Sequence, residues 1–80
     1  MYYVYILKSS KTGKYYIGYT SDLKKRLNYH NNGRTPSLRK HIPLGVARIE
    51  EFRYYDDARK RERQIKSYKS GEAFKRLLKS

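Results

Sequence analysis

The sequence of 80 residues holds 20 Lys and Arg against 7 Asp and Glu, which predicts one small domain, 1–80, with a net charge of +13. The lack of cysteine excludes disulfide bonds, thiolate zinc sites and cysteine nucleophiles. The charge favours a polyanion as partner, and nucleic acid over an anionic membrane, because each Lys or Arg that neutralises a phosphate releases counterions.

Hydrophobic residues make up only 38% of the chain, so we expect several of its ten tyrosines to complete the core. The longest apolar run, Tyr2–Leu7, is too short for a membrane span and lacks the basic flank of a signal peptide. We therefore expect a cytoplasmic protein with no membrane partner.

Two segments near the start have the composition of β-strands. Residues 2–8 (YYVYILK) and 15–20 (YYIGYT) are rich in β-branched and aromatic residues, and a polar stretch with Gly13 separates them. They predict a β-hairpin. Both alternating sets of side chains are largely apolar, so we expect helices to cover both faces of the sheet.

The pairing of this hairpin has a consequence for its tyrosines. If Leu7 faces Tyr16, then Tyr5 faces Gly18, and the phenols of Tyr5 and Tyr16 lie on one surface. A glycine in mid-strand indicates either close approach of a ligand or another backbone, or a local twist or bulge.

The segment that follows the hairpin predicts a helix. Thr20-Ser21-Asp22 offers a hydroxyl N-cap with an acid in the first turn, and Asn31-Asn32-Gly33 offers a stop, so the helix spans about residues 22–31. Residues 33–45 contain two prolines and predict a long loop.

The second half of the chain predicts one strand and two helices. Residues 46–54 alternate moderately and predict a third strand, antiparallel to the hairpin. Asp56 and Asp57 cap a helix to about Lys69. Ser70-Gly71-Glu72 then starts a short helix that carries Ala73, Phe74, Leu77 and Leu78. The predicted class is α+β, in the order β-β-α-β-α-α.

Charged residues share the apolar stripes of both longer helices. At about 100° per residue, Arg26 and His30 fall on the stripe of Leu23 and Leu27, and Arg61 and Glu62 fall on that of Ala58 and Ile65. Buried charges need partners. One interpretation is an Arg–Glu salt bridge that ties a helix to the sheet, or side chains that extend to water. The other is a pocket for an anion and a divalent cation.

Four segments in this order resemble the GIY-YIG nuclease superfamily, most closely its small stand-alone bacterial members. They are YVYIL at 3–7, YIGYT at 16–20, DLKKRLNYHNNG at 22–33 and ARKRERQIK at 58–66. The resemblance covers almost the whole chain. It implies a three-stranded antiparallel sheet flanked by helices and a metal-dependent phosphodiesterase centre.

Carried over by position, the resemblance assigns the site. Glu62 would be the single ligand of Mg²⁺ or Mn²⁺, and Arg26 the clamp on the phosphate. Tyr5 and Tyr16 would lie around the attacking water, and His30 would assist the base. A phenol that serves as base needs a lowered pKa, which nearby cations and a metal favour.

The function most consistent with these features is a divalent-metal-dependent endonuclease on DNA rather than RNA, structure-selective or weakly specific. Alternatives are a nucleic-acid-binding module without turnover and a nuclease subunit that needs a protein partner for targeting. We expect a monomer. The residues expected to contact nucleic acid are Gly18, Lys24, Lys25, Arg34, Arg39, Lys40, Arg59, Lys60, Arg63 and Lys66.

Overall fold

The computed structural model describes residues 1–69 and 71–79, and its strands and α-helices follow the predicted order β-β-α-β-α-α. A 3₁₀ helix, η1, is added between the first α-helix and the last strand. The elements are β1 (Tyr2–Ser9), β2 (Tyr15–Thr20), α1 (Leu23–Asn31), η1 (Pro36–His41), β3 (Leu44–Phe52), α2 (Tyr55–Ser67) and α3 (Glu72–Lys79). Among the described residues, no helix is long and apolar enough to cross a bilayer.

The three strands form one antiparallel sheet in the order β2-β1-β3, so β2 and β3 are its edges. Tyr5 lies opposite Gly18 and Leu7 opposite Tyr16, which is the register that puts the Tyr5 and Tyr16 phenols on one surface. Next to β3, the register shifts between Ile6 and Leu7, because Ala47 is an extra residue in that strand.

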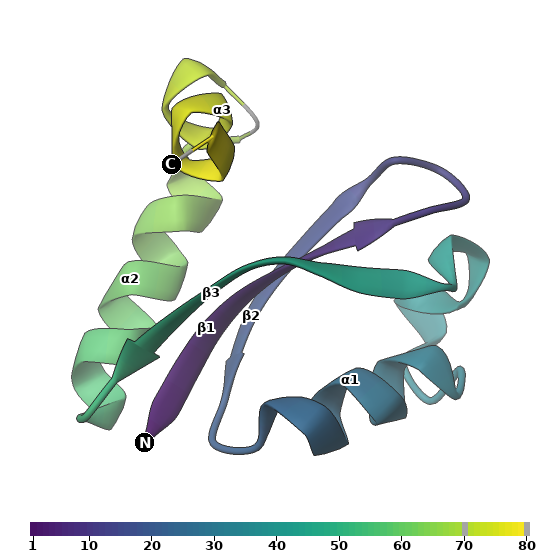
Figure 1. Ribbon diagram of the computed structural model, residues 1–80, viewed down its shortest axis with the longest axis horizontal. Helices are drawn as coiled ribbons and strands as arrows, with labels where there is room; N and C mark the ends of the chain where they lie inside the picture. The colour runs from purple at the N-terminus through teal and green to yellow at the C-terminus, as the bar shows by residue number, and fades with distance from the viewer. Residues whose placement is uncertain (70, 80) are drawn as a thin grey trace.

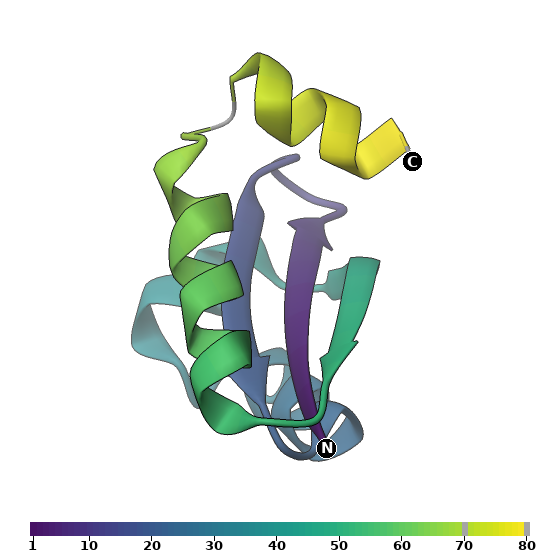
Figure 2. The ribbon, with the colours of Figure 1, turned by 90° about the vertical axis from the view of Figure 1, so that its left-hand side faces the viewer.

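Helices cover both faces of the sheet, as the apolar alternation of the hairpin requires. Figure 1 shows α2 on one side of the strands and α1 on the other, and Figure 2 shows α3 across the end of the sheet beside α2. The core is therefore split by the sheet. The α2 side buries Val4, Ile6, Ala58, Ile65 and Phe74, and the α1 side buries Tyr5, Leu7, Leu38 and Leu44.

The start of α1 differs from the prediction in its capping group. Asp22 itself is the N-cap, and its Oδ1 accepts a hydrogen bond from the backbone N of Lys25 at 3.0 Å. The Thr20 hydroxyl instead accepts from the backbone N of Asp22 at 3.1 Å. The predicted stop is confirmed, since Asn32 is the C-cap and Gly33 follows with a φ of +75°.

The prediction of a long loop over residues 33–45 is wrong, because Pro36–His41 form η1. Pro36 stands in the first turn of η1, where its fixed φ suits a helix, and Leu38 from this helix is buried against the sheet. The Asn31 amide binds both backbone groups of Leu44, at 2.8 and 3.0 Å. This anchor starts β3 two residues earlier than predicted, and β3 also ends two residues earlier because the extended Tyr54 is the N-cap of α2.

The caps predicted for α2 are also wrong. Asp56 and Asp57 lie inside its first turn and make no capping bond, so they act on the exposed N–H groups through charge. The helix ends at Ser67 rather than Lys69. The predicted terminal helix is confirmed over Glu72–Lys79, whereas Ser70 lies outside the described residues.

Arg61 ties α2 to the far edge of the sheet, which is the salt-bridge interpretation of that residue. Its guanidinium donates to the Glu50 carboxylate at 2.7 and 3.0 Å, and Arg48 donates to the same carboxylate at 2.9 Å. Arg48 also donates to the backbone O of Leu77 in α3 at 3.2 Å. These bonds link β3, α2 and α3, and they lower the pKa of Glu50, chiefly through the hydrogen bond from Arg61.

Glu50→Gln is expected to lower the free energy of unfolding by about 2 kcal/mol at pH 7, since a charge-assisted bidentate bond is lost. The pKa of Glu50 lies below its ordinary value of 4.5 in the folded state, so the wild-type advantage is complete above that value and is lost as the pH falls below it. Denaturant titrations at several pH values measure this, with the exposed neighbour Glu51→Gln as control. If wild type and Glu50→Gln had equal denaturation midpoints at pH 7, the bonds from Arg61 and Arg48 to Glu50 would not stabilise the fold.

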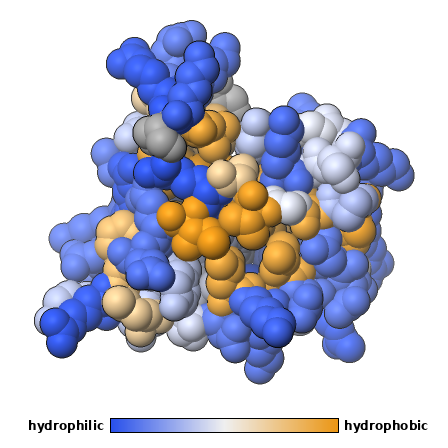
Figure 3. All heavy atoms as spheres, in the orientation of Figure 1, coloured by the Kyte–Doolittle hydropathy of each residue, from blue (hydrophilic) through white to orange (hydrophobic). Residues whose placement is uncertain are grey.

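The surface is mostly hydrophilic, in keeping with the charge, and one apolar area interrupts it. Figure 3 shows apolar side chains gathered over the middle of the sheet on the face seen in Figure 1. In the edge strand β3, Val46 and Ile49 are 42% and 43% exposed. Hydrophilic side chains surround the apolar area in Figure 3.

Candidate active site

A cavity of about 270 Å³ lies beside the edge strand β2. Tyr16 faces α1 and Ile17 faces α2, yet both line it, so the cavity extends around the sheet edge rather than lying on one face. Only there can side chains from α1 and α2 meet without the sheet between them. The lining residues are Tyr5, Tyr16, Ile17, Gly18, Tyr19, Arg26 and Glu62. The cavity thus unites four of the five predicted catalytic residues.

Gly18 allows the Tyr5 phenol to lie directly on the β2 backbone. A Cβ at position 18 would come within 2.6 Å of Tyr5 Cζ, a separation that real side chains do not adopt. The group that approaches Gly18 is therefore Tyr5 itself, and the pairing of β1 with β2 continues past it without a bulge. As a result the Tyr5 ring is almost completely buried.

Gly18→Ala is expected to displace the Tyr5 ring and to cost about 1–3 kcal/mol of stability, as overpacking of a rigid core does. Gly45→Ala is the matched control, because Gly45 lies in β3 with open space around its Cα. Chemical denaturation of both variants measures the difference. If the two variants were equally stable, the contact between Tyr5 and Gly18 would not constrain this strand.

His30 is buried behind Tyr5 and is not among the residues that line the cavity. Its Nε2 lies 3.2 Å from Tyr5 Oη, and its Nδ1 lies 2.7 Å from Thr35 Oγ1. Burial, aided by the nearby Arg26, lowers the pKa of His30 and favours the neutral ring. A neutral ring that accepts from Tyr5 at Nε2 donates to Thr35 at Nδ1, so His30 orients the Tyr5 hydroxyl.

The two tyrosines have different environments. Burial raises the pKa of Tyr5 well above its ordinary value; Tyr16 and Glu62 raise it further, and Arg26 lowers it. The expectation that cations lower a phenol pKa here is therefore wrong for Tyr5, because desolvation outweighs Arg26. Tyr5 is a neutral hydrogen-bonding group. Tyr16 is only half-buried, and its ring meets His30 edge to face at 5.2 Å.

Glu62 contributes one carboxylate to the cavity wall. Its side chain is 15% exposed, and Lys66 Nζ lies 3.2 Å from Oε2 one helical turn along. Within residues 1–69 and 71–79, no group of three or more His, Cys, Asp or Glu could form a complete metal cage. A single carboxylate on an open cavity fits Mg²⁺ or Mn²⁺, since a hard ion can retain most of its water ligands and bind substrate phosphate.

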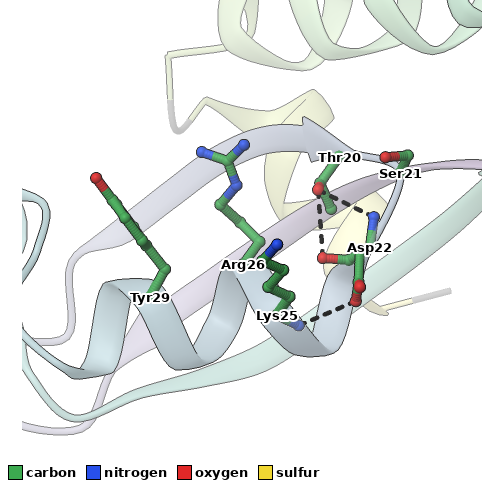
Figure 4. A pocket seen from close by; sticks show the side chains of 6 residues that line it. All are labelled: Thr20, Ser21, Asp22, Lys25, Arg26 and Tyr29. Carbon is green, nitrogen blue, oxygen red and sulfur yellow. Dashed lines mark hydrogen bonds between the residues drawn. The ribbon is translucent and has the colours of Figure 1, made fainter.

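Arg26 projects from α1 on the opposite side of the cavity from α2. Its guanidinium lies 5.9 Å from the centre of the Tyr29 ring, a cation–π contact on the helix surface. Arg26 also lines a second cavity along α1, of about 580 Å³. Figure 4 shows its side chain beside Tyr29 in this second cavity, and because Arg26 also lines the first cavity it borders both spaces.

The cations predicted to contact nucleic acid lie on α1, on α2 and in the segment between α1 and β3. All of them are exposed, whereas Gly18 is buried beneath Tyr5. They are Lys24 and Lys25 on α1, Arg34, Arg39 and Lys40 between α1 and β3, and Arg59, Lys60, Arg63 and Lys66 on α2. Arg39 donates to the backbone O of Gly33, and Arg59 lies over the Tyr55 ring.

Sequence reasoning missed four residues at or beside this site. Ile17 and Tyr19 have the opposite strand parity from Tyr16, so strand alternation gives no reason to place them beside it. Thr35 binds His30 through a contact that only the folded chain creates. Tyr29 did have a signal, because it lies three positions after Arg26 on the same helix face.

The structure thus defines a basic α+β domain in which a carboxylate, a guanidinium and three tyrosines line one open cavity. The GIY-YIG catalytic domain matches residues 1–75. The chain therefore belongs to the GIY-YIG family of nuclease domains, which confirms the resemblance of its four motifs.

Relatives of similar size share most of the chain. A UPF0213 protein of Staphylococcus saprophyticus is 38% identical over 68 residues, which cover 84% of this chain and 82% of the relative. One from Streptococcus pneumoniae is 34% identical over 68 residues, 84% of this chain and 68% of the relative. One from Halobacterium salinarum is 36% identical over 67 residues, which cover 82% of this chain and 86% of the relative. No solved structure matches the chain.

Proposed function

We propose that this protein is a divalent-metal-dependent endonuclease that hydrolyses phosphodiester bonds in DNA. The observation that carries the proposal is the cavity at the β2 edge, which Glu62 from α2 and Arg26 from α1 line together with Tyr5, Tyr16 and Tyr19. A module that only binds nucleic acid gains nothing from a carboxylate among cations. Charge repulsion between that carboxylate and phosphate would weaken its binding.

In this proposal each residue has a distinct task. Glu62 would hold Mg²⁺ or Mn²⁺, which when bound neutralises charge on the phosphoryl oxygens. Arg26 donates paired N–H groups to the non-bridging oxygens of the phosphate. The half-buried Tyr16 orients the attacking water. The neutral Tyr5 hydroxyl, held by His30, keeps the Tyr16 side of the cavity in place.

The reaction is an in-line hydrolysis. Water adds its oxygen to phosphorus and releases one proton to solvent, the bond from phosphorus to the bridging oxygen of the neighbouring nucleotide breaks, and that oxygen takes a proton from solvent. Fixed donors stabilise the charge that develops on the phosphoryl oxygens, because they need no reorganisation during the step.

Because the cations on α1 and α2 are exposed Lys and Arg residues, we expect the protein to select DNA sequences only weakly. Lys and Arg contacts to phosphate position a strand without reading its bases. We therefore propose that DNA structure, or a protein partner, selects the target, and that the 80-residue chain acts as a monomer.

A substrate panel tests the proposed function. The purified protein is incubated with plasmid, flap, branched and single-stranded DNA and with RNA, in Mg²⁺, in Mn²⁺ and in a chelator. We expect DNA cleavage that requires either metal and is fastest on branched or flap substrates. Binding to DNA with no product in any metal condition would favour the module without turnover.

A further inference from the structure

The second cavity lies against the first and is not used by the proposed chemistry. It is hollowed between the β2–α1 turn and one face of α1, with residues 22, 25, 26 and 29 along that face (Figure 4). Its lining residues are Thr20, Ser21, Asp22, Lys25, Arg26 and Tyr29. At about 580 Å³ it is within the range of about 300–1,000 Å³ typical of ligand sites.

The turn supplies a rigid wall to this cavity. Asp22 Oδ1 accepts from the backbone N of Lys25, and Thr20 Oγ1 accepts from the backbone N of Asp22. These bonds hold the start of α1 in place. The one acid among the six lining residues is therefore part of the helix cap, and the opposite wall presents two cations and an aromatic ring.

The opposite wall has the chemistry of a nucleotide site. Tyr29 is 44% exposed, although the Arg26 guanidinium lies over its ring at 5.9 Å. An exposed ring beside cations suits a base together with its phosphate, because every base has a face that can stack and Lys or Arg neutralises the phosphate. Arg26 lines both cavities, so the two spaces are neighbours on the surface.

We propose that this second cavity binds the nucleotide next to the scissile phosphate of a DNA strand. Its base stacks on the exposed part of Tyr29, and its own phosphate binds Lys25. This inference rests on the proposed function, since Arg26 is assigned there to the scissile phosphate. Stacking on Tyr29 makes the affinity for DNA depend on an unpaired base. Contacts to phosphate alone would not produce this dependence.

Binding without turnover tests this subsite separately from the nuclease activity. ¹⁵N-labelled full-length Glu62→Gln protein in a chelator is titrated with tetrathymidylate, and with the same strand in which all four bases are removed. In the parent, we expect the tetrathymidylate to shift the amides of Lys25 and Tyr29 and to bind about 5- to 100-fold tighter than the abasic strand.

When Tyr29→Ala is added to the Glu62→Gln protein, tetrathymidylate should bind no more tightly than the abasic strand. The affinity for the abasic strand itself should equal that of the parent. Tyr29→Phe should retain the factor, and Lys25→Ala should weaken both strands equally. Tyr54→Ala is the matched control, since this exposed tyrosine lines neither cavity and should change nothing.

Three results would overturn the subsite. They are an equal loss for both strands in Tyr29→Ala, no loss for either, and no shift at Lys25 and Tyr29 at any strand concentration. The proposed function is tested by a different measurement, because cleavage by the wild type with metal is scored on the substrate panel. The protein can therefore fail to cleave DNA and still show base-dependent binding. It can also cleave DNA without showing base-dependent binding.

Discussion

Glu62→Gln is expected to abolish cleavage while the protein still binds DNA. The carboxylate is the one acidic group on the wall of the cavity, so its loss removes the proposed metal ligand. The lost stabilisation of the transition state is about 4 kcal/mol, or roughly 10³-fold in rate. Binding should persist or tighten, because a negative charge beside the phosphate is gone and Lys66 loses its partner at 3.2 Å.

The control for this variant is Glu51→Gln, which removes the same charge from an exposed position in β3 outside the cavity. It should cleave as the wild type does. A second measurement uses Mn²⁺, whose paramagnetism should broaden the amide signals around residue 62 in the wild type and in Glu51→Gln only. A Glu62→Gln protein that cleaves at the wild-type rate would show that this carboxylate does not carry the metal.

Arg26→Ala is expected to lose about 10²–10³-fold in kcat and much less in DNA affinity. A donor aimed at the phosphoryl oxygens acts most strongly when charge develops on them, which is in the transition state. Some affinity should also be lost, since Arg26 borders both cavities. Single-turnover cleavage at saturating protein separates the rate from the affinity.

The matched control for Arg26 is Lys24→Ala, an exposed cation on the same helix that lines neither cavity. It should weaken binding modestly and flatten the salt dependence by about one phosphate contact, with kcat unchanged. The pKa of His30, followed by NMR, should rise in Arg26→Ala and not in Lys24→Ala, because Arg26 helps to hold it low. Equal rate losses in the two variants would reduce Arg26 to a general phosphate contact.

Arg61 and Glu62 show what a helical pattern can predict and what it leaves open. Both were predicted to point inward from α2, and the pattern left a salt bridge and a pocket as alternatives. The structure contains both, since Arg61 binds Glu50 in the edge strand β3 and Glu62 lines the cavity at the other edge, β2. Adjacent helix residues point about 100° apart, so the order of the strands beneath them decides their partners.

The loop before β3 shows a second limit. Two prolines and few apolar residues predict an irregular segment, but Leu38 and Leu44 are buried and the Asn31 side chain secures the backbone of Leu44. Two well-placed leucines and one amide outweigh local composition, because their contacts come from β1 and α1 rather than from neighbours in sequence. The same holds for Thr35, whose hydroxyl binds His30 instead of capping η1.

The amino-acid sequence by itself determined the order of the strands and helices, the common face of Tyr5 and Tyr16, and the inward placement of Glu62. These follow from periodicities of two and 3.6 residues, which depend on the backbone alone. Arg26, predicted on the buried stripe of α1, is instead exposed and reaches the cavity from the helix surface. Only the tertiary structure decided that α1 and α2 meet around the β2 edge, that His30 lies behind Tyr5, and that a second cavity adjoins Arg26. Those features depend on which face of the sheet each helix packs against, and contacts between distant segments set that packing.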